Sequence, residues 1–182
     1  GPPRSYPYNS VVYRGSIITV QRGRVRMNRG KVVAFDVVEH YGGVAVVPLL
    51  GDRVLLVRQP RPVAGESLLE IQAGKLEGPD DDILARAQAE LSEEVGYRAG
   101  RLLPAAEFYV SPGYCTERIH VFLGLDLAPV DAAPEETEEI ERVALTLGEV
   151  RRMLDERRFR DSKTIIGLRE LLAYLDRVNP HG

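Results

Sequence analysis

Three glutamates close to the end of one predicted helix are the residues most suited to chemistry in this sequence. Glu90, Glu93 and Glu94 are spaced three and four residues apart, so a helix would stack them on one face. Like charges at this spacing repel one another, and a helix that ends at Gly96 adds the negative end of its dipole. A hard divalent cation with oxygen ligands would offset both penalties. The alternative is a solvated acidic face, which three acids alone would favour.

The helix that carries these glutamates is predicted to start after Asp80–Asp82, which offer N-cap and first-turn acids, and to end at Val95. Its apolar residues recur at helical spacing on a different face from the glutamates, and this face predicts a packed side: Ile83, Leu84, Ala87, Leu91 and Val95. The acidic stripe is therefore expected on the side of the helix that does not enter the core.

Strands are expected on both sides of this helix, because runs rich in Val, Ile and Tyr are broken by Gly and other turn residues. The expected strands are Ser10–Val20, Arg24–Met27, Val32–Glu39, Gly43–Leu50, Arg53–Gln59, Ser67–Ala73, Ala106–Val110, Ile119–Leu125 and Ile140–Leu145. Turns are expected at Arg22-Gly23, Asn28–Gly30 and Gly51-Asp52.

Two helices are predicted at the end of the chain. A capping box of Thr146 and Glu149 starts the first, over Leu147–Arg157, and the second runs from about Ser162 to Val178. The order of elements predicts an α+β fold with a mixed sheet between helices and an N-terminal region of antiparallel strands.

The composition limits the class of function. The chain has 182 residues, enough for one domain with a proper core. Its net charge of −3, with both signs interspersed, argues against a nucleic-acid partner. The single Cys115 excludes an internal disulfide framework and indicates a reducing compartment. No apolar run is long enough to span a membrane and no signal-peptide pattern is present, so we expect a cytoplasmic protein without a membrane partner.

The segment from Gly74 to Tyr97 resembles the Nudix box, written G-x5-E-x7-R-E-U-x-E-E-x-G-U with U an apolar residue, and its second half is nearly complete. Two departures stand out. Six residues instead of five separate Gly74 from the acid, which is Asp81, and the arginine of the box is Ala89. In the family that arginine helps to hold the catalytic glutamates. Arg86, one turn before Glu90, is the candidate substitute.

Further segments resemble the ADP-ribose pyrophosphatase branch of this family. They are Val57–Arg61, Leu69–Lys75, Ser111–Gly113 and the acidic loop Glu136–Ile140, with Pro60 in place of an aromatic residue and Gln72 in place of a proline. The resemblance implies a Nudix fold over residues 41–182. It also implies that the strands of residues 1–40 exchange with a partner to form a homodimer in which both subunits line the site.

The resemblance also implies roles for single residues. Implied metal ligands are the side chains of Glu90, Glu94 and Glu138 and the backbone carbonyl of Ala73. The implied general base is Glu136, with Glu93 as runner-up. Implied substrate contacts are Arg58, Arg61, Glu70, Pro112 and Gly113, with Arg61 on a phosphate. The competing interpretations are a solvated acidic loop, a surface arginine at position 61 and a plain turn at Pro112-Gly113.

The activity that the resemblance implies is hydrolysis of ADP-ribose to AMP and ribose 5-phosphate with Mg²⁺, or Mn²⁺ in its place. Carboxylates suit these cations, which clamp a diphosphate and activate water. Two alternatives stay open: hydrolysis of other nucleoside diphosphate derivatives (nucleotide sugars, dinucleoside polyphosphates or FAD), and a ligand sensor of the same fold that has lost catalysis. Ala89 is the residue that favours the sensor.

Overall fold

The fold is built on one mixed sheet of seven strands. The computed structural model describes residues 10–131 and 140–179. The sheet strands are β4 (Gly43–Leu50), β5 (Arg53–Arg61), β6 (Glu66–Glu70), β7 (Gln72–Lys75), β8 (Tyr97–Tyr109), β9 (Arg118–Pro129) and β10 (Glu141–Thr146). Their order is β10-β5-β4-β9-β8, with β6 beside β5 and β7 beside β4. Among these seven strands, β4 and β9 are the one parallel pair, so the prediction of a mixed sheet is confirmed.

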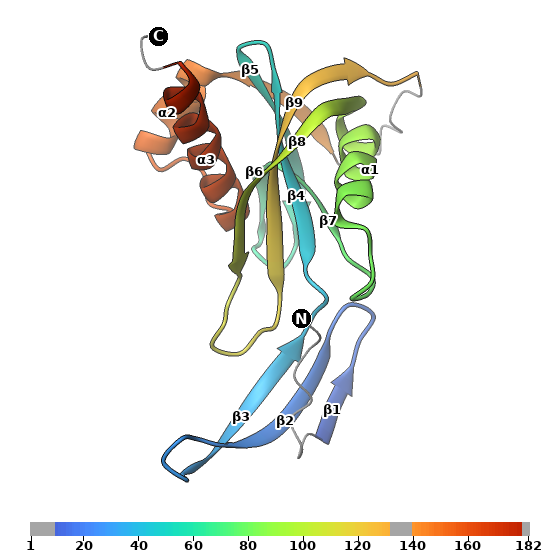
Figure 1. Cartoon of the computed structure of the whole chain (residues 1–182), viewed down its shortest axis with the longest axis vertical. Coiled ribbons are helices and arrows are strands. Elements are labelled where there is room, and N and C mark those ends of the chain that lie inside the picture. The colour runs from blue at the N-terminus through green and yellow to red at the C-terminus, as the bar shows by residue number, and fades with distance from the viewer. Residues whose placement is uncertain (1–9, 132–139, 180–182) are drawn as a thin grey trace.

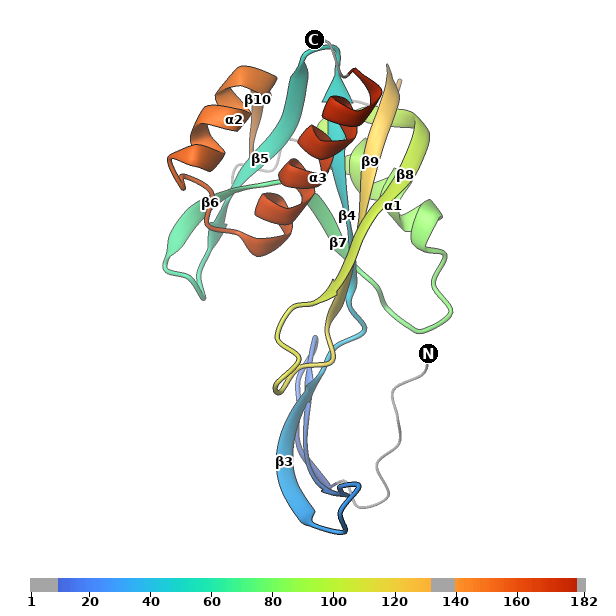
Figure 2. The same cartoon turned by 60° about the vertical axis from the view of Figure 1, so that its left-hand side comes forward.

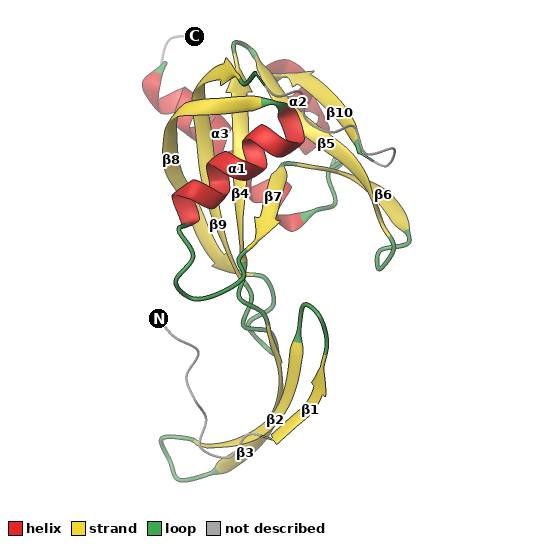
Figure 3. Ribbon diagram, turned by 90° about the vertical axis from the view of Figure 1, so that its right-hand side faces the viewer, coloured by secondary structure: helices red, strands yellow, loops and turns green. Residues whose placement is uncertain are grey.

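Helices cover both faces of this sheet (Figure 1). On one face lies α1 (Ile83–Val95), which crosses the strands as Figure 3 shows. On the other face lie α2 (Leu147–Asp155) and α3 (Ser162–Val178). The predicted layers of an α+β fold are therefore confirmed. In the described part of the chain, no helix is both long enough and apolar enough to cross a membrane.

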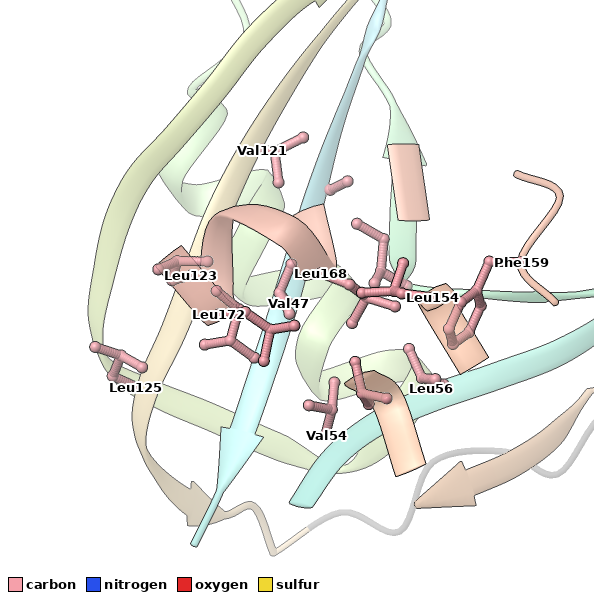
Figure 4. Close-up of a cluster of buried hydrophobic side chains, with 14 of the residues drawn as sticks. Val47, Val54, Leu56, Val121, Leu123, Leu125, Leu154, Phe159, Leu168 and Leu172 are labelled. Carbon is pink, nitrogen blue, oxygen red and sulfur yellow. The ribbon is translucent and has the colours of Figure 1, made fainter. Parts of the chain in front are cut away.

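Two apolar cores join the layers. The core under α1 contains Ala87, Leu91 and Val95 of the helix, with Ile83 packed against it, as predicted. Leu84, which was predicted for the same face, is exposed instead. The larger core lies between the sheet and the two C-terminal helices, and Figure 4 shows Val47 and Leu168 within it. Each fully buried aliphatic side chain contributes roughly 1.5–3 kcal/mol to folding, so these cores hold α1 and α3 firmly against the sheet.

The ends of the helices follow from local sequence. The Asp82 side chain accepts a hydrogen bond from Ala85 N at the start of α1, and Gly96 ends this helix at a φ of 78°, a left-handed conformation that suits glycine. The capping box of Thr146 and Glu149 is present in α2, as predicted. These caps fix the position of the glutamate-bearing helix along its own axis.

Strands β4 and β5 form a hairpin that opens like a fork. They pair with each other only next to the Gly51-Asp52 turn, at Leu49–Leu50 and Arg53–Val54. Further from the turn, β7 pairs with β4 and β6 pairs with β5. The Gln72 amide nitrogen donates to Leu55 O at 3.0 Å and bridges the gap between β7 and β5. The segment that leads to Gly74 thus lies between β4 and β5 where these two strands separate.

The prediction of one strand over Ser67–Ala73 is wrong, because the chain changes partner strand at Ile71. There β6 ends and β7 begins. The Ile71 N–H, which leaves the ladder at this break, donates to Thr164 Oγ1 on α3 at 3.0 Å. Strand β8 is also longer than the predicted Ala106–Val110, because a bulge between Pro104 and Ala106 lets it continue past the proline.

Residues 10–39 form a separate three-stranded sheet of β1 (Ser10–Arg14), β2 (Thr19–Arg26) and β3 (Val32–Glu39), called the arm below. It extends away from the main body (Figures 1 and 2). The turn at Gly30 is confirmed, with a φ of 80°. The turn predicted at Arg22-Gly23 is wrong: Gly23 lies inside β2 opposite Phe35, because β2 pairs with β3 along its whole length. The chain turns instead at Gly15, whose N–H donates to Ile18 O.

The arm is joined to the turn between β8 and β9. Val38 N donates to Tyr114 O at 2.7 Å, and Thr116 N donates to Val38 O at 3.0 Å. The Thr116 hydroxyl also accepts from His40 N and donates to His40 O. The end of β3 and the β8–β9 turn are thus held by backbone hydrogen bonds as a short parallel pair.

Candidate active site

Glu90 lies against Gly74, with no room for a side chain between them. The Glu90 side chain projects from α1 toward β7 and is 13% exposed. A Cβ atom at Gly74 would overlap the Glu90 carboxyl group and lie 2.6 Å from Glu90 Cγ. Ala73, the predicted carbonyl ligand, is the preceding residue on β7. The first glycine of the predicted motif therefore has a concrete role, which is to leave space for the carboxylate.

Arg86 lies beside Glu90 one helical turn earlier. The Arg86 Nη1 atom is 3.7 Å from Glu90 Oε1, which is an ion pair but too long for a hydrogen bond. Burial raises the pKa of Glu90, the negative charge of Glu93 adds to the rise, and the Arg86 cation opposes it. Arg86, the predicted substitute for the box arginine, thus forms a weak ion pair with Glu90.

Glu94 is partly buried, and one of its carboxylate oxygens is fully enclosed. Its Oε2 atom has no hydrogen-bond partner among the described residues. Burial raises the pKa of Glu94 to about 7, and the charge of Glu90 adds to the rise, while the Arg61 cation opposes it. A buried oxygen without a donor costs roughly 1–3 kcal/mol. An unpaired oxygen of this kind is available to a bound cation or substrate. The carboxylate oxygens present here therefore fit a divalent metal ion.

Glu93 is exposed on α1, so it can reach solvent beside the other two glutamates. Arg142 on β10 closes the end of this helix, because its Nε donates to Glu94 O at 2.8 Å. A cation at this end of the helix also favours the dipole. The structure therefore brings Glu90, Glu93 and Glu94 together as predicted neighbours on α1.

Arg61 and Glu70 form a second group of charges next to the glutamates. Glu70 is only 1% exposed. Arg61 Nε and Nη2 donate to the two oxygens of Glu70 at 2.8 and 3.1 Å. Lys163 at the start of α3 donates to Glu70 Oε1 at 2.6 Å and to Asp161 Oδ2 at 3.0 Å. Lys163 was not predicted as a site residue, because a lysine in the first turn of an amphipathic helix is most often a surface residue.

The three other predicted substrate contacts, Arg58, Pro112 and Gly113, are exposed. The Arg58 Nε atom on β5 donates to Glu141 Oε2 on β10 at 3.2 Å. Pro112 and Gly113 are exposed in the turn between β8 and β9, at the end of β8 opposite to α1's last turn. In Figure 1 this turn lies at the end of the main body that is nearest the arm. Arg58 lies close to the Arg61 and Glu70 pair along the same two strands, because it is opposite Leu69, the residue before Glu70. Pro112 and Gly113 lie instead in the turn that is joined to the arm.

Two predicted site residues, Glu136 and Glu138, lie outside the described residues. Within residues 10–131 and 140–179, no group of three or more His, Cys, Asp or Glu side chains converges closely enough to hold a metal ion alone. The described part of the site therefore consists of two neighbouring carboxylates on α1, Glu90 and Glu94, with the backbone of β7 beside them.

Comparison with known proteins bears on this site. The NUDIX domain family matches residues 40–166, which is more than half of the chain. The ADP-ribose pyrophosphatase of Bacillus subtilis is 32% identical over 163 residues, and the match covers 88% of each chain. The methanol dehydrogenase activator of Bacillus methanolicus matches with the same identity and coverage. A crystal structure of an ADP compounds hydrolase superimposes with a TM-score of 0.79 over 97% of this chain and 98% of that one, at 20% identity, which shows a shared fold.

Proposed function

The chain belongs to the Nudix family, and on that premise we propose that it hydrolyses the diphosphate bond of ADP-ribose to give AMP and ribose 5-phosphate. The observation that carries the proposal is the pair of carboxylates on α1. Glu90 fits into the space that Gly74 leaves, and one turn later Glu94 has a buried oxygen with no hydrogen-bond partner among the described residues. The relative from Bacillus subtilis, named an ADP-ribose pyrophosphatase, supports the substrate.

Glu90 and Glu94 are the residues that would hold a divalent cation, together with the Ala73 carbonyl and Glu138. Hard oxygen donors favour Mg²⁺, with Mn²⁺ as the alternative. When bound, such an ion neutralises charge on the diphosphate and lowers the pKa of a water molecule. Because the pKa of Glu94 is raised to about 7, this side chain must lose a proton to become a ligand near neutral pH.

Arg61 is proposed to bind a substrate phosphate. Its side chain is 42% exposed, and Glu70 accepts hydrogen bonds from the guanidinium edge formed by Nε and Nη2. A planar guanidinium can use its remaining N–H groups on phosphate oxygens. Glu70 would then act by orienting Arg61, since the carboxylate itself is enclosed.

The remaining site residues keep their predicted roles as proposals. Glu136 is the proposed general base for the attacking water, with the exposed Glu93 as runner-up. Arg58, Pro112 and Gly113 are proposed to contact the non-reacting parts of the substrate.

A homodimer formed through residues 1–40 is also proposed. Six apolar side chains on the arm have exposed fractions between 42% and 58%: Val11, Val12, Tyr13, Ile17, Met27 and Val32. Exposed apolar side chains in this number on one small sheet support an interface with another chain. The reducing compartment that the single cysteine indicates supports a cytoplasmic enzyme, with a small nucleoside diphosphate as its substrate and no nucleic-acid partner.

A substrate panel tests the activity. The protein is incubated with Mg²⁺ and ADP-ribose, a nucleotide sugar, a dinucleoside polyphosphate or FAD, and the products are separated by anion-exchange chromatography. We expect the highest kcat/KM with ADP-ribose, and AMP plus ribose 5-phosphate as products. Equal turnover of nucleotide sugars would overturn the substrate assignment. Binding without turnover of any diphosphate would favour the ligand sensor to which Ala89 points.

A further inference from the structure

The N-terminal turn of α3 is attached to the junction between β6 and β7 at two adjacent positions. Lys163 Nζ donates to Glu70 Oε1 at 2.6 Å, and Thr164 Oγ1 accepts from Ile71 N at 3.0 Å. The Asp161 carboxylate, which caps the helix, also accepts from both Lys163 and Thr164. The helix that starts more than ninety residues later thus fixes the last residue of β6 and the break that follows it.

The contact between α3 and the sheet is tight enough to make this attachment rigid. Gly167 allows the approach, because a Cβ atom there would lie 2.8 Å from Val47 Cγ2 and 3.0 Å from Ile71 Cδ1. Lys163 and Thr164 are themselves buried. Packed interiors transmit displacement because they contain little free space. A displacement of the first turn of α3 is therefore expected to displace Glu70.

Glu70 passes this constraint on to Arg61. Its carboxylate is enclosed, and it binds the guanidinium through two parallel hydrogen bonds, a geometry that fixes both position and plane. Arg61 in turn is half-exposed on β5. Lys163, Glu70 and Arg61 form a chain of contacts that runs from the buried start of α3 to the surface beside the α1 glutamates.

Charge balance gives Lys163 a second effect. Arg61 and Lys163 carry two positive charges, and Glu70 and Asp161 carry two negative ones, so the group is neutral. Without Lys163 it has one excess negative charge next to Glu94. A diphosphate that approaches would be repelled, and Glu70 would compete with the substrate for Arg61 more strongly.

We propose that Lys163 is a positioning residue for the diphosphate site, because through Glu70 it holds the Arg61 guanidinium in the orientation that receives a substrate phosphate. This inference rests on the proposed function of the site. The competing explanation is a buried ion pair that only stabilises the fold, although such pairs are weak sources of stability compared with apolar replacements. The two explanations differ in what happens to substrate binding.

The test uses Lys163→Gln, which keeps a hydrogen-bond donor and removes the charge, and Arg169→Gln as the control on the exposed side of the same helix. For ADP-ribose we expect the KM of Lys163→Gln to rise by about tenfold, with kcat changed by less than about threefold and Arg169→Gln unchanged. In an Arg61→Ala background, Lys163→Gln should raise KM by less than about twofold, because the route through Arg61 is already lost. An unchanged KM, or effects that simply add in the double variant, would refute the proposal.

A double variant covers the case in which Lys163→Gln does not fold. Glu70→Gln with Lys163→Met replaces the buried charges by a neutral pair, which is often tolerated. It should show the same rise in KM, because Arg61 has lost its charged anchor. A folded double variant with the parent KM would refute the positioning role.

An NMR measurement decides the inference without catalysis. The Nε–H signal of Arg61, identified by its loss in Arg61→Ala, should shift or broaden in Lys163→Gln and stay in place in Arg169→Gln. If the parent protein hydrolyses no nucleoside diphosphate, the proposed function fails while this signal still reports on the positioning. An Arg61 signal that Lys163→Gln leaves unchanged would refute the inference even in an active enzyme.

Discussion

Replacing Gly74 with alanine tests the arrangement of Glu90 most directly. The added methyl group would lie 2.6 Å from Glu90 Cγ and overlap the carboxyl group, whereas ordinary contacts of a Cβ atom are 3.4–4 Å. The side chain of Glu90 must therefore move by nearly 1 Å at Cγ and further at its oxygens. Gly74 has no positive φ, so an alanine there introduces no backbone strain. The substitution moves a carboxylate and leaves the fold in place.

The size of the effect follows from this displacement. A misplacement of about 1 Å in a catalytic group can cost roughly a hundredfold in rate, which corresponds to about 2.7 kcal/mol in activation free energy. We therefore expect kcat for ADP-ribose to fall by about a hundredfold. The stability should change by less than about 1 kcal/mol, because the clash is with the flexible end of a side chain and alanine reduces the entropy of the unfolded chain.

The assay measures release of AMP at saturating ADP-ribose and Mg²⁺, together with thermal unfolding of each variant. Gly78→Ala is the matched control, since a Cβ atom at Gly78 would meet nothing within 4 Å and the residue lies in the loop just after Gly74. We expect the control to keep the parent kcat. Parent-like activity in a folded Gly74→Ala variant would show that the position of Glu90 does not matter for the reaction.

Three further predictions concern the charged residues of α1. Glu90→Gln should lower kcat by more than about a hundredfold without loss of stability, because burial raises the pKa of Glu90 and neutralising it relieves that cost; unchanged turnover would remove Glu90 from the mechanism. Arg86→Ala should lower kcat by only about twofold, since an ion pair one helical turn apart contributes about 0.5 kcal/mol, and a fall above tenfold would instead assign to Arg86 the role of the missing box arginine. In EDTA the parent should lose stability as the pH rises from 4.5 to 7, because the folded state, in which burial raises the pKa of Glu94 to about 7, binds the proton more tightly than the unfolded chain. Glu94→Gln should remove that loss, which amounts to about 3 kcal/mol. Chemical unfolding at pH 5 and pH 8 measures the free energy of unfolding of both proteins. An identical pH dependence in the parent and the variant would contradict the raised pKa of Glu94.

The helices could be predicted from sequence because their signals are local. The observed α3 has the predicted bounds, and α1 lies between Asp82, one of the three acids predicted to start it, and the predicted Gly96. Periodic apolar residues and capping residues act within a few positions of each other, so no knowledge of the rest of the chain is needed. The neighbouring positions of Glu90 and Glu94 follow from the helix alone.

The parts that could not be predicted depend on contacts between distant segments. A glutamate at the end of β6 and a lysine at the start of α3 carry no sequence signal that they meet. Their pairing requires α3 to pack against the sheet in which β4 and β5 separate. The break at Ile71 has the same origin, since its N–H donates to Thr164 on α3 and not to a neighbouring strand. Gly23 misled the turn prediction because pairing with a full neighbouring strand outweighs the local preference of one glycine.

The joint between the arm and the body has a mechanical consequence. Val38 is far in sequence from the β8–β9 turn, yet its backbone binds the turn in both directions. Its N–H donates to Tyr114 O, and its carbonyl oxygen accepts from Thr116 N. Gly42, at a φ of 90°, brings the next stretch of chain so close to Arg118 that any side chain there would strike its carbonyl oxygen. The arm is thus tied by its backbone to the turn that contains Pro112, so we expect the two segments to open together. Amide hydrogen exchange should accordingly find Val38 and Thr116 opening at a common rate.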